Sequence, residues 1–102
     1  MRTLEYRSPR LAMDFCVDFV TGTALFRGTC VDVNGEGLRA SFDLPVPKSL
    51  VGSLILHHPL CRASIPARVV YLLKDQVGFV FFDHTRRDQD VLFHFMGIVG
   101  IQ

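Results

Sequence analysis

The fold is decided by residues 25–44, which read LFRGTCVDVNGEGLRASFDL. The first part, residues 25–33, is predicted to be a strand, and the pair Asn34-Gly35 turns the chain at its end. Asn-Gly between two alternating runs is the strongest short signal of a β-hairpin. The returning strand points four apolar residues inward: Leu38, Ala40, Phe42 and Leu44. This stretch therefore predicts an antiparallel hairpin with one buried face.

Alternation with a period of two on either side of the hairpin predicts further strands. The first begins at Leu11 and has an apolar face opposite a polar one: Met13, Phe15, Val17 and Phe19 against Asp14, Cys16 and Asp18. Three more are expected at residues 54–56, 64–73 and 77–82. The 64–73 strand is expected to turn one set of residues inward: Ile65, Ala67, Val69, Tyr71 and Leu73.

A change of period near the C-terminus predicts one helix. Thr85-Arg86-Arg87-Asp88 has the S/T-x-x-D/E form of a helix start, and the apolar residues that follow recur at helical spacing to about residue 100. Six short strands and a closing helix predict an all-β fold, either a small antiparallel barrel or a sandwich, with the helix packed on it. Residues 1–10 are expected to be an N-terminal arm, and residues 11–102 a single domain.

Composition narrows the classes of function. The chain has 102 residues, 49% of them apolar, and a net charge of +1, which argues against a general nucleic-acid binder. Its three cysteines form no CxxC pair and are expected to be free thiols, mostly buried. The N-terminus lacks the apolar core of a signal peptide, and no segment is long and apolar enough to enter a membrane. A cytoplasmic protein is therefore expected.

Five residues are candidates for binding a small phosphorylated nucleotide: Arg7, Arg10, Asp32, Asn34 and Gly37. Guanidinium groups neutralise phosphate and stack on bases. A carboxylate such as that of Asp32 can accept hydrogen bonds from a guanine edge, and glycine lets backbone N–H groups reach an anion. The competing interpretation is a plain hairpin turn, in which Asn34-Gly35 supplies positive φ, preceded by a solvated basic arm.

The order of these residues resembles a PilZ domain, the bacterial receptor module for cyclic di-GMP. The family pattern is Arg-x-x-x-Arg in the N-terminal arm, followed by D/N-x-S-x-x-G after the second strand. Asp32-x-Asn34-x-x-Gly37 matches the second motif at the acid and the glycine, and Leu38-Arg39 resembles its usual continuation. The resemblance extends over residues 6–82, where Leu50-x-Gly52-x-Leu54, Ala67-Arg68-Val69-Val70 and Val77-Gly78-Phe79-Val80-Phe81 are similar to later parts of the family.

Two positions depart from the family pattern. When Arg10 is aligned with the second arginine, Tyr6 stands in place of the first, and Arg7 follows one residue later. Asn34 stands where the family has serine. The resemblance implies a six-stranded antiparallel barrel whose arm folds over the barrel mouth when cyclic di-GMP binds, with Asp32 and Asn34 reading guanine edges or phosphate. The alternative is a degenerate PilZ domain that binds no nucleotide and acts as an adaptor.

Other polar residues give weaker signals. His57-His58 are adjacent on an expected strand and point to opposite faces, so no metal site is predicted. No catalytic constellation is visible at any known spacing, so no enzyme and no cofactor are expected. The aspartates at positions 14, 18 and 43 are interpreted as solvated. Arg86-Arg87 is either solvated or in contact with an acidic partner.

The closing helix carries more apolar residues than one buried stripe requires: Leu92, Phe93, Phe95, Met96, Ile98, Val99 and Ile101. Either the helix lies deep against the barrel mouth, or its outer side contacts another molecule. A protein partner and a homodimer through this helix are the two interfaces that the pattern allows. The second interpretation is favoured because so small a domain has little core in which to bury every side.

Overall fold

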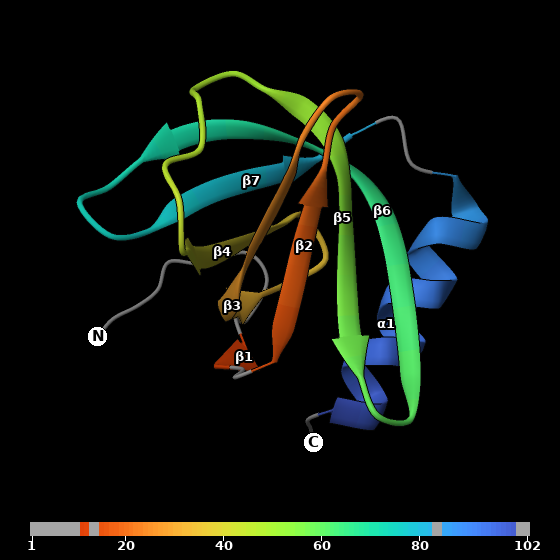
Figure 1. Cartoon of the computed structure of the whole chain (residues 1–102). Helices are drawn as coiled ribbons and strands as arrows, with labels where there is room; N and C mark the ends of the chain where they lie inside the picture. The colour runs from red at the N-terminus through yellow and green to blue at the C-terminus, as the bar shows by residue number, and fades with distance from the viewer. Residues whose placement is uncertain (1–10, 13–14, 83–84, 100–102) are drawn as a thin grey trace, which may run out of the picture.

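Antiparallel strands close on themselves to form a six-stranded barrel with one helix (Figure 1). The computed structural model describes residues 11–12, 15–82 and 85–99. The elements in chain order are β1 (Leu11–Ala12), β2 (Cys16–Val20), β3 (Leu25–Val33), β4 (Gly37–Phe42), β5 (Val51–His58), β6 (Cys61–Leu72), β7 (Val77–Phe81) and α1 (Arg86–Val99). The predicted fold class is therefore confirmed.

The barrel closes because β4 pairs with two strands. Neighbours follow the order β3-β2-β5-β6-β7-β4, and β4 pairs back with β3 across the Asn34-Gly35 hairpin. The short β1 pairs with the end of β3 and β2 with its beginning, so the two share one position in the ring. No helix in the described part of the chain is long and apolar enough to cross a membrane.

The interior is filled by alternate residues of every long strand, as the sequence pattern predicts. Helix α1 packs on β6 (Figure 1) and adds Leu92 and Phe95 to the core. The Phe95 ring meets Phe15 edge-on with centroids 5.0 Å apart. The predicted helix start is also confirmed, because Thr85 N–H donates to Asp88 Oδ2 (3.0 Å) and Asp88 N–H donates to Thr85 Oγ1 (3.1 Å).

Two β-bulges interrupt the regular alternation. In β3 the partners change from Cys30↔Ala40 to Asp32↔Arg39, which leaves Val31 as an extra residue. In β6 they change from Val69↔Phe79 to Tyr71↔Gly78, which leaves Val70 as another. An extra residue in a strand turns the side chains that follow it to the opposite face of the sheet. Asp32 and Tyr71 are thereby moved to the outer face.

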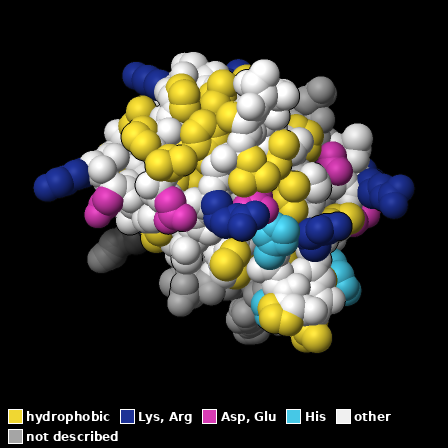
Figure 2. Space-filling model, viewed as in Figure 1, with side chains coloured by type: hydrophobic (Ala, Val, Ile, Leu, Met, Phe, Trp, Pro, Cys, Tyr) yellow, Lys and Arg dark blue, Asp and Glu magenta, His cyan; other side chains and the backbone are white. Residues whose placement is uncertain are grey.

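Three predicted side-chain orientations are wrong, two of them because of the β6 bulge. Tyr71 and Leu73 were expected inside, but both follow the β6 bulge and are exposed. Leu44 is exposed because β4 ends at Phe42, before this residue can enter the core. Leu44 and Leu73 border a groove at the end of the barrel near the β6–β7 turn, where Figure 2 shows hydrophobic side chains on the surface.

Two further expectations about polar residues and thiols need correction. Asp18 lies on the outer face of β2 as expected, yet it is buried rather than solvated, because side chains of neighbouring strands cover it. Of the three cysteines, only Cys30 is fully buried; Cys61 is half-buried and Cys16 is exposed.

Candidate functional site

The two bulges bring four residues into one row on the outer face of the barrel. Register partners run Asp32↔Arg39 from β3 to β4, Arg39↔Gly78 from β4 to β7, and Gly78↔Tyr71 from β7 to β6. Directly opposed residues of neighbouring strands have their side chains within contact distance. The row therefore presents a carboxylate, a guanidinium and a phenol ring side by side over four strands.

Asp32 and Arg39 form an ion pair at one end of this row. Arg39 Nε donates to Asp32 Oδ1 (3.2 Å) and Oδ2 (3.0 Å), and Nη2 also donates to Oδ2. The Asp32 side chain is only 9% exposed, whereas the Arg39 side chain is 32% exposed. Hydrogen bonding to Asp32 raises the pKa of Arg39, with a smaller contribution from Tyr71. Asp32 thus fixes a permanently charged guanidinium at the surface.

Tyr71 lies flat over a glycine at the other end of the row. A β-carbon at Gly78 would be 2.2 Å from two ring carbons of Tyr71, Cε2 and Cζ, so only glycine leaves room for the ring. An aromatic ring covering a glycine on the neighbouring strand compensates for the missing side chain. Tyr71 is 37% exposed, so part of this residue remains open to solvent.

The hairpin that follows Asp32 is held by the Asn34 side chain. Its Oδ1 accepts hydrogen bonds from the backbone N–H groups of Glu36 (2.7 Å) and Gly37 (3.0 Å). This is an Asx-type turn, and neither Asn34 nor Gly35 has positive φ, in contrast to the expected two-residue turn. The Gly37 N–H expected to reach an anion is already occupied.

Glycine at position 37 has a packing reason as well. A β-carbon there would lie 2.2 Å from the carbonyl oxygen of Phe79, so β4 and β7 could not approach as closely. The carbonyl of Glu36 accepts a hydrogen bond from Phe81 N–H (2.9 Å), which ties the turn to β7. The D-x-N-x-x-G motif therefore builds a rigid hairpin, whatever else it contacts.

The predicted arginines lie outside the described residues, as does Tyr6. The chain emerges beside the hairpin, however, because β1 pairs Leu11 with Val33 and Ala12 with Asp32. Arg10 is bonded directly to Leu11, and consecutive α-carbons are about 3.8 Å apart. The described residues thus bring Asp32, Asn34 and Gly37 together and place Leu11, the first described residue, beside them.

A second polar cluster covers Asp18 on another face of the barrel. Arg27 Nε donates to Asp18 Oδ1 (3.1 Å), and His57 Nε2 lies 2.9 Å from Oδ2. Burial raises the pKa of Asp18, but the hydrogen bonds from His57 and Arg27 outweigh it, so the pKa is lowered overall. No group of residues in the described ranges is arranged to hold a metal ion.

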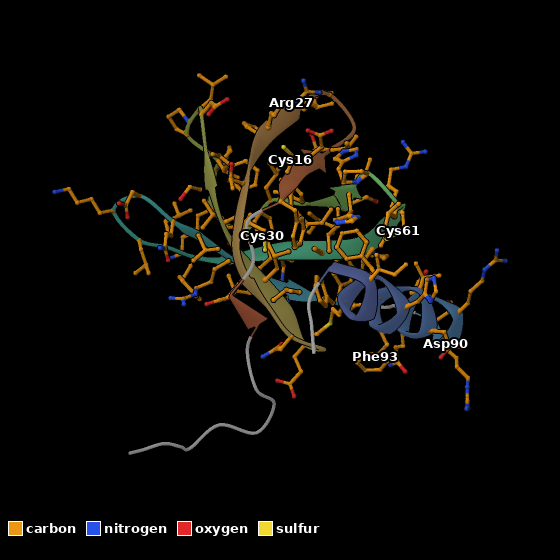
Figure 3. The ribbon with its side chains drawn as sticks, turned by 90° about the horizontal axis from the view of Figure 1, so that it is seen from below. Cys16, Arg27, Cys30, Cys61, Asp90 and Phe93 are labelled. Carbon is orange, nitrogen blue, oxygen red and sulfur yellow. The ribbon has the colours of Figure 1, made fainter. Side chains whose placement is uncertain are left out.

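Helix α1 touches the hairpin through one aromatic side chain. A β-carbon at Gly35 would lie 3.5 Å from Cε1 and Cζ of Phe93, so this ring rests against the turn. Phe93 is nevertheless 57% exposed and lies on the side of α1 away from β6 (Figure 3). The outer side of the helix therefore keeps an apolar residue at the surface, next to the candidate site.

Sequence reasoning missed Arg39 and Tyr71 as members of the site. Arg39 was placed on the outer face, but its pairing with Asp32 depends on the bulge at Val31. The available signal for Tyr71 was Gly78, a glycine inside an otherwise apolar strand, which often marks close approach of another group.

Solved structures of several bacterial proteins share this fold. The PilZ domain of YcgR from Escherichia coli, solved with c-di-GMP, matches with a TM-score of 0.79 and 10% identity over 94% of this chain and 92% of that chain. The PilZ domain of CeSA from a cellulose-synthesizing bacterium matches with a TM-score of 0.73 and 13% identity, over 86% of this chain and 94% of that chain. The Bacillus subtilis inhibitor of motility, MotI/DgrA, matches with a TM-score of 0.73 and 14% identity, over 93% of this chain and 50% of that chain.

The sequence itself matches one protein family. Comparison with curated proteins gives no match, whereas the model of the PilZ domain matches residues 5–97. PilZ domains are non-catalytic receptor modules for cyclic di-GMP, in agreement with the expectation that this protein is not an enzyme. The match includes residues 5–10, the bulged hairpin, the barrel and nearly all of α1. The chain therefore belongs to the PilZ domain family.

Proposed function

We propose that this protein is a cyclic di-GMP receptor that acts in the cytoplasm and signals by protein–protein contact. The observation that supports the proposal most is the pairing of β1 with Asp32 and Val33. An arm that leaves the barrel at this point starts beside the hairpin. Arg10 and Arg7 are then within reach of a ligand that also touches Asp32.

In this proposal the row across the barrel is the ligand platform. Arg39 offers outward N–H groups to a phosphate or to the acceptor edge of guanine. The Tyr71 ring offers a stacking surface. The Asp32 carboxylate is an acceptor-only group of the kind that can meet the N–H groups of a guanine edge, and its hydrogen bonds also hold Arg39 in the platform. Asn34 contributes its Nδ2 donors, since its Oδ1 is used by the turn.

The platform offsets the incomplete arginine motif. Losing one charge-assisted hydrogen bond costs about 1.5–3 kcal/mol, which weakens binding about ten- to a hundredfold. Stacking of a base on an aromatic ring contributes about 1–3 kcal/mol. Tyr6, at the position of the first arginine, and Tyr71 are the two residues that supply such stacking in this proposal.

Calorimetric titration with cyclic di-GMP tests this function. We expect saturable heat with a dissociation constant near micromolar, or about −8 kcal/mol. Arg10→Ala and Asp32→Ala should each weaken binding by about tenfold or more. Arg27→Ala is the matched control, because it removes an arginine from a different face. Absence of heat at high-micromolar ligand would rule the function out.

A second candidate function follows from Phe93: a degenerate domain that works as an adaptor or homodimer through α1. The exposed ring beside Gly35 favours it, because an apolar side chain left at the surface often marks an interface. Sedimentation velocity over a range of concentrations tests the homodimer. Self-association that Phe93→Asp abolishes, with no heat from the nucleotide, would favour this candidate over the receptor.

A further inference from the structure

A groove outside the candidate site lies between the start of β6 and α1. It has a volume of about 360 Å³, at the small end of ligand pockets. Its floor is apolar and consists of Cys61, Val91 and Phe95. Figure 3 shows Cys61 and Asp90 on the two elements that border it, β6 and α1. The helix residues are three and four positions apart, so a single stripe of α1 faces the groove.

Two guanidinium groups line this groove. Arg62 comes from β6 and Arg87 from α1, and neither forms an ion pair with another residue in the described ranges. His94 adds a third basic group, while Asp90 is the one acidic side chain of the lining. Arginine forks match carboxylates in shape and charge. The groove thus combines an apolar floor with rims that attract carboxylates.

Basic groups continue from the groove across the barrel. Arg62 is the register partner of His57 on β5, and His57 and Arg27 both contact the buried Asp18. Figure 2 shows dark blue and cyan side chains, with magenta among them, across the middle of one face. From β3 to β6 there are three strand spacings of about 4.8 Å. The row is therefore about 14 Å long, the length of about four extended residues.

We propose that this face binds an acidic segment of a protein partner in extended form. One aromatic or aliphatic side chain of the segment enters the groove, and flanking carboxylates pair with Arg62 and Arg87. The remaining acidic residues follow the row past His57 toward Arg27, whose side chain is 69% exposed and has N–H donors besides the Nε–H that binds Asp18. A small anion could occupy the groove but could not span the row, which is why a chain is the occupant. The proposal does not depend on nucleotide binding, because the groove and the Asp32 row lie on different parts of the barrel.

Fluorescence anisotropy with a labelled peptide, Glu-Asp-Phe-Asp-Glu, tests this inference on the full chain. Salt is kept near 50 mM, where screening of surface charge is weak. We expect saturable binding that Arg62→Glu and Arg87→Glu each weaken about tenfold or more. Lys74→Glu makes the same change of charge at the β6–β7 turn, at the opposite end of β6, and should leave binding within about twofold. Replacing the peptide's Phe by Ser should weaken binding severalfold.

The outcomes separate docking from general electrostatics. If Arg62→Glu or Arg87→Glu fails to fold by circular dichroism, Arg62→Gln and Arg87→Gln provide the same comparison. Equal loss with Lys74→Glu, no saturation below about 1 mM peptide, or complete displacement by citrate at the same carboxylate concentration would each overturn the proposal. Asp32→Ala should retain peptide binding even if it abolishes the response to cyclic di-GMP.

Discussion

Breaking the Asp32–Arg39 pair should show that this ion pair stabilises the fold as well as the site. Arg39→Met removes the guanidinium and keeps the apolar stem. Asp32 is 6% exposed, and the structure gives Arg39 three contacts to its carboxylate. Hydrogen bonds to charged groups contribute about 1.5–3 kcal/mol, and partial exposure of Arg39 favours the lower half of that range. We expect a loss of about 2 kcal/mol, or about 8–16 °C in Tm.

A double-mutant cycle in urea at pH 7 isolates the pair. The free energies of unfolding of Arg39→Met, Asp32→Asn and the double variant should reveal a coupling of about 1.5–2 kcal/mol. Arg27→Met is the comparison, because its guanidinium makes one contact from a side chain that is 69% exposed, and it should cost less than about 1 kcal/mol. Coupling below about 0.5 kcal/mol would refute the view that Asp32 holds Arg39 in place.

Three further predictions concern other parts of the chain. Gly78→Ala should destabilise by about 1–3 kcal/mol in thermal melts, because the new methyl meets Tyr71, while Gly22→Ala, with nothing within 4 Å, should change little; stabilisation at 78 would contradict this account. Asp18→Asn should cost about 1.5–3 kcal/mol at pH 7. Because the pKa of Asp18 is lowered in the folded state, the stability difference between the wild type and Asp18→Asn should vanish as the pH falls through that pKa, which lies below the ordinary 3.8. A stability difference that stays constant with pH would contradict this prediction. Thr85→Ala should cost about 1 kcal/mol by loss of the helix cap, measured by urea unfolding, and no loss would exclude a role for the cap.

Local sequence rules predict much of the barrel because local forces set it. Period-two alternation gave the β3 strand with the bounds observed, Leu25–Val33, and Asn34-Gly35 marked the hairpin. Thr85 and Asp88 marked the start of α1. Each of these depends on neighbours only a few residues away.

The site was less predictable because it depends on two extra residues. Nothing in the alternation of β3 or β6 distinguishes Val31 or Val70 from an ordinary strand position, yet each moves a key side chain to the other face. Burial of Asp18 was also missed, since it requires knowing that β2 lies between β3 and β5. Sequence periodicity does not predict which strands pair when they are distant in the chain.

Amide chemical-shift mapping with cyclic di-GMP tests the central claim most directly, namely that the arm and the bulged hairpin meet at one nucleotide site. We expect saturable shifts at Asn34, Gly35 and Gly37, along the row through Arg39 and Gly78, and in the arm, with little change at Lys74 or Arg62. A titration that moves no resonance, or one whose shifts gather at the β6–α1 groove and spare the hairpin, would contradict it.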